Sequence, residues 1–175
     1  MRRRRRTVQA LGLAAGLVVA ALVAAKAEQI GTAGAVNPAA QSAPPGGAMR
    51  TMNVGGNIVF KERINTSDSG SVQLVFVDRT TLNIGPNSQL TIDEFVYDPK
   101  ANTGRMTATL TKGVMRFVGG QASHTGGATI KTPATTLGVR GGVVTVRHDQ
   151  QNGTRAINHF GVMTAQSGQG TEVIR

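Results

Sequence analysis

Cysteine and tryptophan are absent from the 175 residues, and tyrosine occurs once. A chain without cysteine has no disulfide, no thiolate zinc ligand and no nucleophilic thiol, and it has no lipidated cysteine. Aromatic residues make up 3% of the sequence, so the stacking platforms of nucleic-acid-binding proteins are not expected. Glycine, by contrast, occurs 23 times, and hydrophobic residues make up 39%. This composition indicates a packed domain with many turns and few long helices.

The positive charge is concentrated at the amino terminus. The formal net charge is +10, with 19 Lys and Arg against 9 Asp and Glu. Arg2–Arg6 and Lys26 supply six of these cations, and no acid precedes Glu28. From Glu28 onward thirteen basic residues are scattered among nine acids. The rest of the chain is therefore only mildly basic, and we expect no nucleic-acid partner.

The first 27 residues are typical of an export signal. Arg2–Arg6 are followed by Ala10–Ala25, an uninterrupted run of 16 Ala, Leu, Gly and Val residues. As a helix this run would be about 24 Å long, which is short for a bilayer core of roughly 30 Å. Ala25 and Ala27 fit the rule for cleavage before Glu28. We predict a signal peptide over residues 1–27 and a periplasmic or secreted protein. The alternative is an uncleaved anchor in the inner membrane that faces the periplasm.

Two segments of different composition follow the leader. Residues 28–50 are rich in Ala, Gly, Pro, Ser and Gln without a sustained hydrophobic period, which predicts a flexible linker. Residues 51–175 contain short runs of Val, Ile, Leu, Phe and Thr separated by turn residues, roughly every eight to twelve positions. This pattern predicts an all-β domain of short antiparallel strands in a sandwich, a roll or a solenoid-like arrangement. Because a strand-like run (Thr171–Ile174) ends the sequence, truncation of the domain at its C-terminus stays open.

Alternation of apolar residues locates the individual strands. We expect them at residues 71–77, 80–84, 88–92, 105–111, 114–118, 128–132, 142–148, 154–158 and 160–166. Asp78-Arg79 predicts a two-residue turn between the first two, and Lys112-Gly113 predicts a hairpin turn. No amphipathic helix of useful length is expected after the leader.

Three motifs carry a resemblance to a known family. The run Phe76–Ser88 (FVDRTTLNIGPNS) resembles the FecR-type domain, and so does Thr132–Gly141 (TPATTLGVRG). Arg63–Thr66 and Gly70 fit the same family pattern upstream. The resemblance covers about residues 54–142. Arg79 stands where the family usually has glycine, so this turn needs a conformation that a β-carbon tolerates.

The resemblance implies a role in signalling across the cell envelope. The best-known FecR proteins regulate iron uptake through a cytoplasmic anti-sigma region, one membrane helix and a periplasmic part that responds to an outer-membrane receptor. Only nine residues precede the apolar run here, too few for an anti-sigma region. The chain is therefore similar to a stand-alone, exported form of the domain. Its implied partner is an envelope protein, either a receptor or a transmembrane regulator.

Three residues are candidate contacts for such a partner. Arg140 lies in a glycine-rich run and could bind a carboxylate or phosphate in bidentate geometry. The alternative for Arg140 is an internal ion pair with Asp78 or Asp93. Phe95 and Tyr97 alternate with an intervening valine and could form an exposed contact strip. The alternative for both aromatic side chains is packing on the core.

No arrangement of residues in the sequence predicts catalysis. His148 and His159 could face each other across a hairpin, but two imidazoles and one Asp would make a weak metal site. No Ser, His and Asp occur in a nucleophile motif, so we expect no catalytic, cofactor or metal site. We predict a non-enzymatic module for recognition of an envelope protein or ligand, with cell-surface or iron-uptake signalling as its context. The alternative is a structural or glycan-binding module that binds cell-wall glycan. Contact with the membrane is expected only through an uncleaved N-terminal segment.

Overall fold

The computed structural model describes residues 28–175, which form thirteen strands and one five-residue helix. In chain order these are β1 (Gln29–Asn37), β2 (Ala40–Ala43), β3 (Arg50–Thr51), β4 (Asn57–Val59), β5 (Arg63–Thr66), β6 (Ser71–Phe76), β7 (Thr81–Ile84), β8 (Gln89–Asp98), β9 (Thr103–Val118), α1 (Gln121–Thr125), β10 (Ala128–Lys131), β11 (Thr136–Asp149), β12 (Gly153–Ser167) and β13 (Gly170–Ile174). The predicted all-β class is confirmed. Within this part of the chain, no helix is long and apolar enough to cross a bilayer. The predicted signal peptide (1–27) lies outside the described residues.

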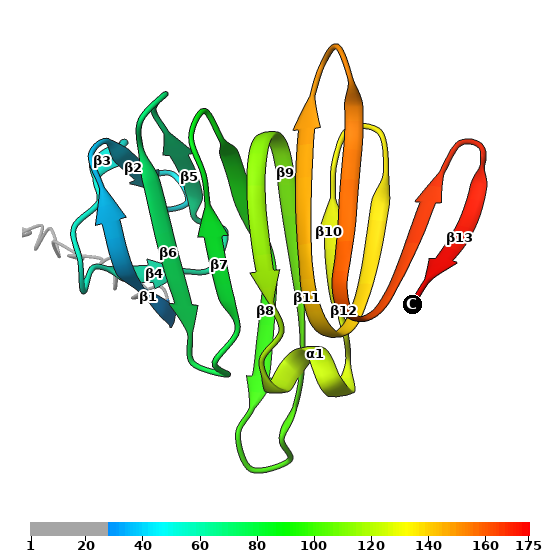
Figure 1. Cartoon of the computed structure of the whole chain (residues 1–175). Coiled ribbons are helices and arrows are strands. Elements are labelled where there is room, and N and C mark those ends of the chain that lie inside the picture. The colour runs from blue at the N-terminus through cyan, green and yellow to red at the C-terminus, as the bar shows by residue number, and fades with distance from the viewer. Residues whose placement is uncertain (1–27) are drawn as a thin grey trace, which may run out of the picture.

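The strands lie in two layers around one hydrophobic core (Figure 1). The front layer has the order β4-β1-β6-β7 and continues with the C-terminal parts of β9 and β11 and the N-terminal part of β12. The back layer has the order β3-β2-β5-β8 and continues with the N-terminal part of β9, then β10, the N-terminal part of β11, the C-terminal part of β12, and β13. All of these pairings are antiparallel except that of β9 with β10. The ring of Phe76 on β6 stacks on that of Phe95 on β8, with centroids 5.1 Å apart, which joins the two layers.

The alternation expected from the sequence is confirmed on the front layer. Val72, Leu74 and Phe76 of β6 are buried, and so are Leu82 and Ile84 of β7. The residues between them point outward, because successive side chains of a strand lie on opposite faces. The front layer therefore has one apolar face on the core and one outer face.

Three long strands pass from one layer to the other, and each bends at glycine. β9 bends at Gly113, β11 at Gly141 and Gly142, and β12 at Gly161. Gly113 and Gly161 have φ angles of 98° and 89°, a region that favours glycine. These three strands are therefore longer than the short runs expected from the sequence. Lys112-Gly113 is a bend within β9, which contains 16 residues, and not a hairpin turn.

The segment predicted to be a flexible linker, residues 28–50, is part of the sheet. β1 pairs with β4 and β6, and β2 pairs with β3 and β5. Ile30 and Ala33 are buried in the core. A Cβ at Gly31 would lie 2.7 Å from the carbonyl oxygen of Val75, so the missing side chain lets β1 approach β6 closely. The linker prediction is wrong because this strand packs through small residues and carries no long apolar run.

A buried carboxylate ties the β6–β7 hairpin to the end of β9. Asp78 is 1% exposed. Its Oδ1 accepts a hydrogen bond from the backbone N–H of Thr80 (2.9 Å), and its Oδ2 accepts from the Thr80 hydroxyl (2.7 Å) and from the backbone N–H of Ala122 (3.0 Å). The backbone N–H of Gly120 donates to Thr80 Oγ1 (3.1 Å), and that of Gln121 donates to the carbonyl oxygen of Asp78 (2.9 Å). The hairpin is thus bonded to α1, which directly follows β9.

The turn beside Asp78 has the conformation that glycine usually supplies. Arg79 has a φ of 70°, in the left-handed region where a residue with a β-carbon is uncommon. Its backbone N–H donates to the carbonyl oxygen of Phe76 at 2.9 Å, which closes the turn. The hydrogen bonds of Asp78 and the turn together hold Arg79 in this conformation.

Replacement of Asp78 by alanine should destabilise the protein strongly. The variant leaves the buried N–H groups of Thr80 and Ala122 without an acceptor, and each unsatisfied group costs about 1–3 kcal/mol. We expect the free energy of unfolding to fall by about 3 kcal/mol or more in urea titrations. The matched control is Asp98→Ala, because Asp98 accepts two backbone hydrogen bonds in an exposed turn. Equal losses in the two variants would contradict the role assigned to Asp78.

Replacement of Gly161 by alanine should destabilise the crossing of β12. A Cβ at this position would overlap the carbonyl oxygen of Gly141, and the positive φ would add strain. We expect a loss of about 2 kcal/mol or more in the free energy of unfolding. Gly168 provides the control, because a Cβ there would lie in open space and its φ is not in the left-handed region. Gly168→Ala should leave the unfolding midpoint nearly unchanged, and a neutral Gly161→Ala would refute the close approach.

Candidate functional site

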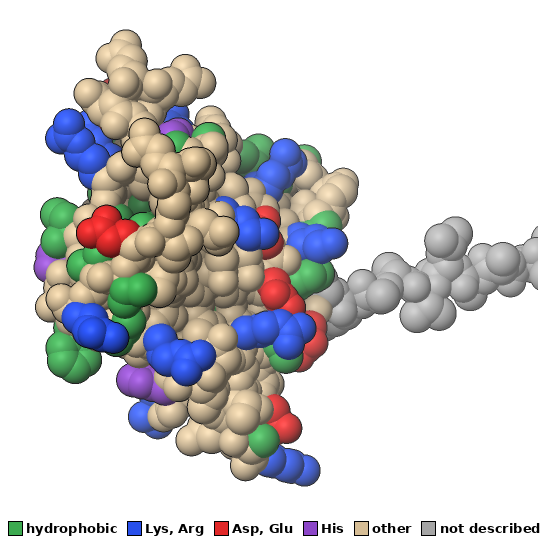
Figure 2. Space-filling model, turned by 90° about the vertical axis from the view of Figure 1, so that its right-hand side faces the viewer, with side chains coloured by type: hydrophobic (Ala, Val, Ile, Leu, Met, Phe, Trp, Pro, Cys, Tyr) green, Lys and Arg blue, Asp and Glu red, His purple; other side chains and the backbone are tan. Residues whose placement is uncertain are grey.

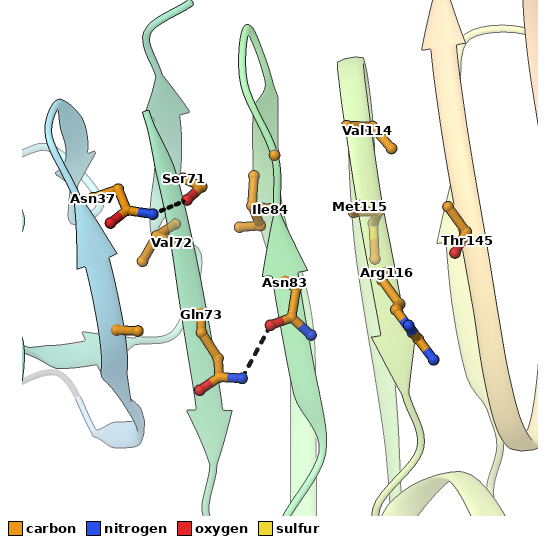
Figure 3. A pocket seen from close by; sticks show the side chains of 12 residues that line it. Asn37, Ser71, Val72, Gln73, Asn83, Ile84, Val114, Met115, Arg116 and Thr145 are labelled. Atoms are coloured by element: carbon orange, nitrogen blue, oxygen red, sulfur yellow. Dashed lines mark hydrogen bonds between the residues drawn. The ribbon is translucent and has the colours of Figure 1, made fainter. Parts of the chain in front are cut away.

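An open groove crosses the outer face of the front layer (Figure 3). Its volume is about 330 Å³, and it extends from β1 to β11. Its polar lining consists of Asn37, Ser71, Gln73, Asn83, Arg116 and Thr145. These residues come from five different strands, so the fold and not a local motif brings them together.

Strand register places four of these residues side by side. Gln73 of β6 pairs with Asn83 of β7, Asn83 pairs with Arg116 of β9, and Arg116 pairs with Thr145 of β11. We call these four residues the polar row. Their strand neighbours are buried, as Leu82 and Phe117 illustrate. The polar row therefore lies at right angles to the strands, on the face that points away from the core.

The hydrogen bonds within the groove leave some of its donors and acceptors available to solvent. Gln73 Nε2 donates to Asn83 Oδ1 at 3.0 Å, and Thr145 Oγ1 lies 2.9 Å from Nε2 of His159 (Figure 3 shows the amide pair). Among the described residues, Arg116 has no hydrogen-bond or ion-pair partner. Each amide still has donors and acceptors to offer, and the guanidinium has five N–H donors. The row can therefore bind a ligand that carries hydroxyl or anionic oxygen atoms.

The two histidines near the β11–β12 hairpin do not converge. His148 is buried, and its Nδ1 lies 3.0 Å from the hydroxyl of Thr154. His159 is exposed and contacts Thr145 on the outer face. Residues 28–175 contain no group of three His, Asp or Glu side chains that could hold a metal ion. The groove offers hydrogen bonding and one positive charge beside a largely apolar lining.

Arg140 lies on the opposite side of the molecule from the groove. It is exposed on the outer face of the back layer, where it pairs with Val162 of β12. Neither acid considered as its internal partner contacts it. Asp78 bonds Thr80 and Ala122, and Asp93 accepts a hydrogen bond from the Thr109 hydroxyl at 2.6 Å. Arg140 therefore remains accessible.

The exposed aromatic strip predicted for β8 is not formed. Phe95 is buried against Phe76, and the ring of Tyr97 packs partly on the core. The hydroxyl of Tyr97 lies 3.0 Å from Oδ1 of Asn102. The cause is a β-bulge between Ile92 and Glu94, which shifts the alternation by one residue and turns the aromatic side chains inward. The contact prediction is wrong for Phe95, and the structure does not bring Arg140, Phe95 and Tyr97 together.

The polar row was missed from the sequence, although each strand carries a local signal. Gln73, Asn83 and Arg116 are single polar residues between two buried apolar neighbours. That pattern marks an outward position on any strand. Asn83 and Arg116 pair although they are 33 residues apart in the sequence. Only such pairing of distant strands shows that these positions form one row.

Comparison with known proteins agrees with the fold. Residues 62–159 match the family described as FecR protein. Two crystal structures "of a putative anti-sigma factor from Parabacteroides distasonis" resemble the chain. One has 14% identity and a TM-score of 0.51, and the other 10% and 0.47. Each match covers 64% of this chain and 50% of the solved chain, so it spans about half the length of those proteins. No curated protein matches the sequence.

Residues of the polar row should not be needed for folding. Arg116 is exposed and has no partner within the described chain, so Arg116→Gln should change the free energy of unfolding by less than about 0.5 kcal/mol. Its neighbour Phe117 points into the core, and Phe117→Ala should cost about 3–5 kcal/mol. Urea unfolding of both variants checks this. A large loss in Arg116→Gln would mean that the row has a structural role.

Proposed function

The chain belongs to the FecR protein family, and we propose that it is a non-enzymatic, exported module that recognises an envelope protein or ligand. The observation that carries this proposal is the polar row. Four aligned polar side chains lie on the outer face of the front layer, where Arg116 is exposed and the other three are half-buried. The guanidinium of Arg116 has no partner within the described chain. Exposed polar groups that folding does not use are free to bind a partner.

Export is part of the proposal. The basic start, the apolar run and the cleavage rule predict removal of residues 1–27, which leaves Glu28 as the first residue. β1 begins at Gln29 and pairs along its length with β4 and β6. Cleavage before Glu28 would therefore keep all the strands of the described residues. The protein would then act in the periplasm, or at the membrane surface if the leader remains as an anchor.

A signalling role would require a second protein. The solved structures that resemble this fold are described as an anti-sigma factor, and the match covers half of their length. We propose that this chain supplies the recognising domain and that any signal, including one linked to iron uptake, passes through a partner. A structural or glycan-binding role in the cell envelope is the alternative.

A second candidate surface favours a protein partner. β13 pairs only with β12 among the described strands, so its other edge has free backbone groups. Val173 on this strand is 53% exposed. An extended segment of another protein could add to this edge as a further strand.

Photo-crosslinking in cells tests both surfaces. A diazirine amino acid would replace Asn83 in the polar row, Val173 on β13 or Lys131 on the outer face of the back layer, in the full-length chain. We expect capture of a partner from position 83 and not from position 131, with mass spectrometry also showing a mature chain that starts at Glu28. Capture only from position 173 would support strand addition. If no position captured a protein or glycan, the recognition function would be refuted.

A further inference from the structure

Charge is distributed unequally between the two halves of the domain. Residues 103–175, which include β9 to β13, carry eight Lys and Arg but only two Asp and Glu. Residues 28–102 carry five basic residues and seven acids. Figure 2 looks at the molecule from the side of β13, and Lys and Arg side chains are spread across that face. The basic half attracts anions, and the groove reaches into it at Arg116 and Thr145.

Three arginines lie at neighbouring positions on the outer face of the front layer. Arg147 of β11 pairs directly with Arg155 of β12, which places their Cβ atoms about 5 Å apart. Arg147 also pairs with Val114 of β9, and Arg116 lies two residues further along β9. Arg116 and Arg147 are therefore diagonal neighbours, about 7–8 Å apart. All three side chains are exposed. We call Arg116, Arg147 and Arg155 the arginine cluster.

The arginine cluster has an electrostatic cost in the free protein. Like charges directly opposite each other destabilise a pair of strands. Among the described residues, one acid forms an ion pair with the cluster: Oδ2 of Asp149 lies 3.8 Å from Nε of Arg147. The N–H of Asn152 donates to Asp149 and holds the pKa of this carboxyl below its ordinary value, so it stays charged. One carboxylate for three guanidinium groups leaves positive charge that an anionic ligand would neutralise.

Exposed apolar side chains lie beside the arginine cluster. Ile157 and Phe160 of β12 are 57% and 71% exposed. Ile157 pairs with Thr145, next to the polar row, and Phe160 pairs with Val143. His159, which lies between them, is the extra residue of a bulge and shifts the register of β12. Because of this shift, Ile157 and Phe160 point outward on the same face although they are three residues apart. Polar, basic and apolar groups thus share one surface.

The geometry of this surface favours a linear sugar polymer over a peptide. From Gln73 on β6 to Arg155 on β12, the polar row and the arginine cluster together cross five neighbouring strands, a span of about 19 Å at 4.8 Å per strand. A strand face offers side chains and no free backbone groups, so an extended peptide could not pair with it as it can with an edge. Amides that both donate and accept suit sugar hydroxyls, and arginine suits carboxylates.

We propose that the polar row and the arginine cluster together bind a linear acidic polysaccharide. This inference rests on the proposed recognition function and takes its glycan-binding alternative as the ligand class. Gln73, Asn83 and Thr145 would bond the hydroxyl groups, and the arginine cluster would pair with the carboxylates. Ile157 and Phe160 would pack against the apolar faces of the sugar rings.

Binding of oligogalacturonate to the full-length chain tests the proposal. The neutral comparison is the same oligomer with its carboxylates methyl-esterified, and poly-L-glutamate tests whether any carboxylate polymer suffices. We expect oligogalacturonate to bind at least about tenfold more tightly than its methyl ester, because only the free carboxylates form charge-assisted hydrogen bonds with arginine. We also expect it to bind more tightly than polyglutamate, because only the sugar carries hydroxyl groups that the polar row can bond. No binding of oligogalacturonate, or equal binding of its methyl ester, would overturn the proposal. Tighter binding of polyglutamate would assign the surface to an acidic protein instead.

Matched variants locate the site. The triple variant Arg116→Gln, Arg147→Gln, Arg155→Gln should lose at least about tenfold in affinity. The control triple Lys112→Gln, Lys131→Gln, Arg140→Gln removes the same charge from other positions in this half of the domain and should lose much less. Equal losses would mean diffuse attraction to a basic protein and would contradict the site.

The single variant Arg155→Gln provides a second readout. It removes the like-charged pair with Arg147, so it should unfold at the same or a slightly higher urea concentration while it weakens oligogalacturonate binding. Unchanged binding in a folded Arg155→Gln would count against the arginine cluster. If oligogalacturonate fails to bind but position 83 still captures a partner in cells, the ligand class is wrong and the recognition function stands.

Discussion

The buried carboxylate of Asp78 fixes the register on which the outer face depends. It bonds the β6–β7 hairpin to the backbone at Ala122, just beyond the end of β9. Because side chains alternate along a strand, a slip of one residue between β7 and β9 would turn Asn83 or Arg116 toward the core. The hydrogen bonds of Asp78 therefore hold the front layer in the one register that forms the polar row. A residue in the interior thus determines the chemistry of a surface that it does not touch.

The fold separates the residues that stabilise it from those available for binding. Inward residues such as Leu82 and Phe117 form the core. Asn83 and Arg116, which are next to them in the sequence, point outward and do not contribute to the core. Bends at Gly113, Gly141 and Gly161 let three strands serve both layers, and they bring the basic C-terminal strands to the edge of the groove. A stable sheet can in this way present like charges close together on its surface. Binding of an anion would reduce the repulsion between them. Recognition by such a surface needs no catalytic group.

Sequence patterns predicted the local structure well where a strand alternates clearly. The strands around Asp78 and the FecR resemblance follow from residues 71–88, whereas the turn contains Val77 as well as the predicted Asp78 and Arg79. Three features depend on distant packing and could not be predicted in this way. β1 packs through Gly31 and other small residues, a bulge in β8 reverses the direction of Phe95, and the bend at Gly113 continues β9 instead of ending it. The polar row belongs to the same group, because it exists only through pairing of strands that are remote in the sequence.

The most direct test of the account is to map ligand contacts residue by residue. Amide chemical shifts of the folded protein would be followed by NMR during titration with oligogalacturonate. The account predicts changes at Asn83, Arg116 and Thr145 and at Arg155, all on the outer face of the front layer. Little change is expected at Arg140 on the back layer. Changes centred on the back layer or on β13, with the polar row unaffected, would contradict the claim that this face is the binding surface.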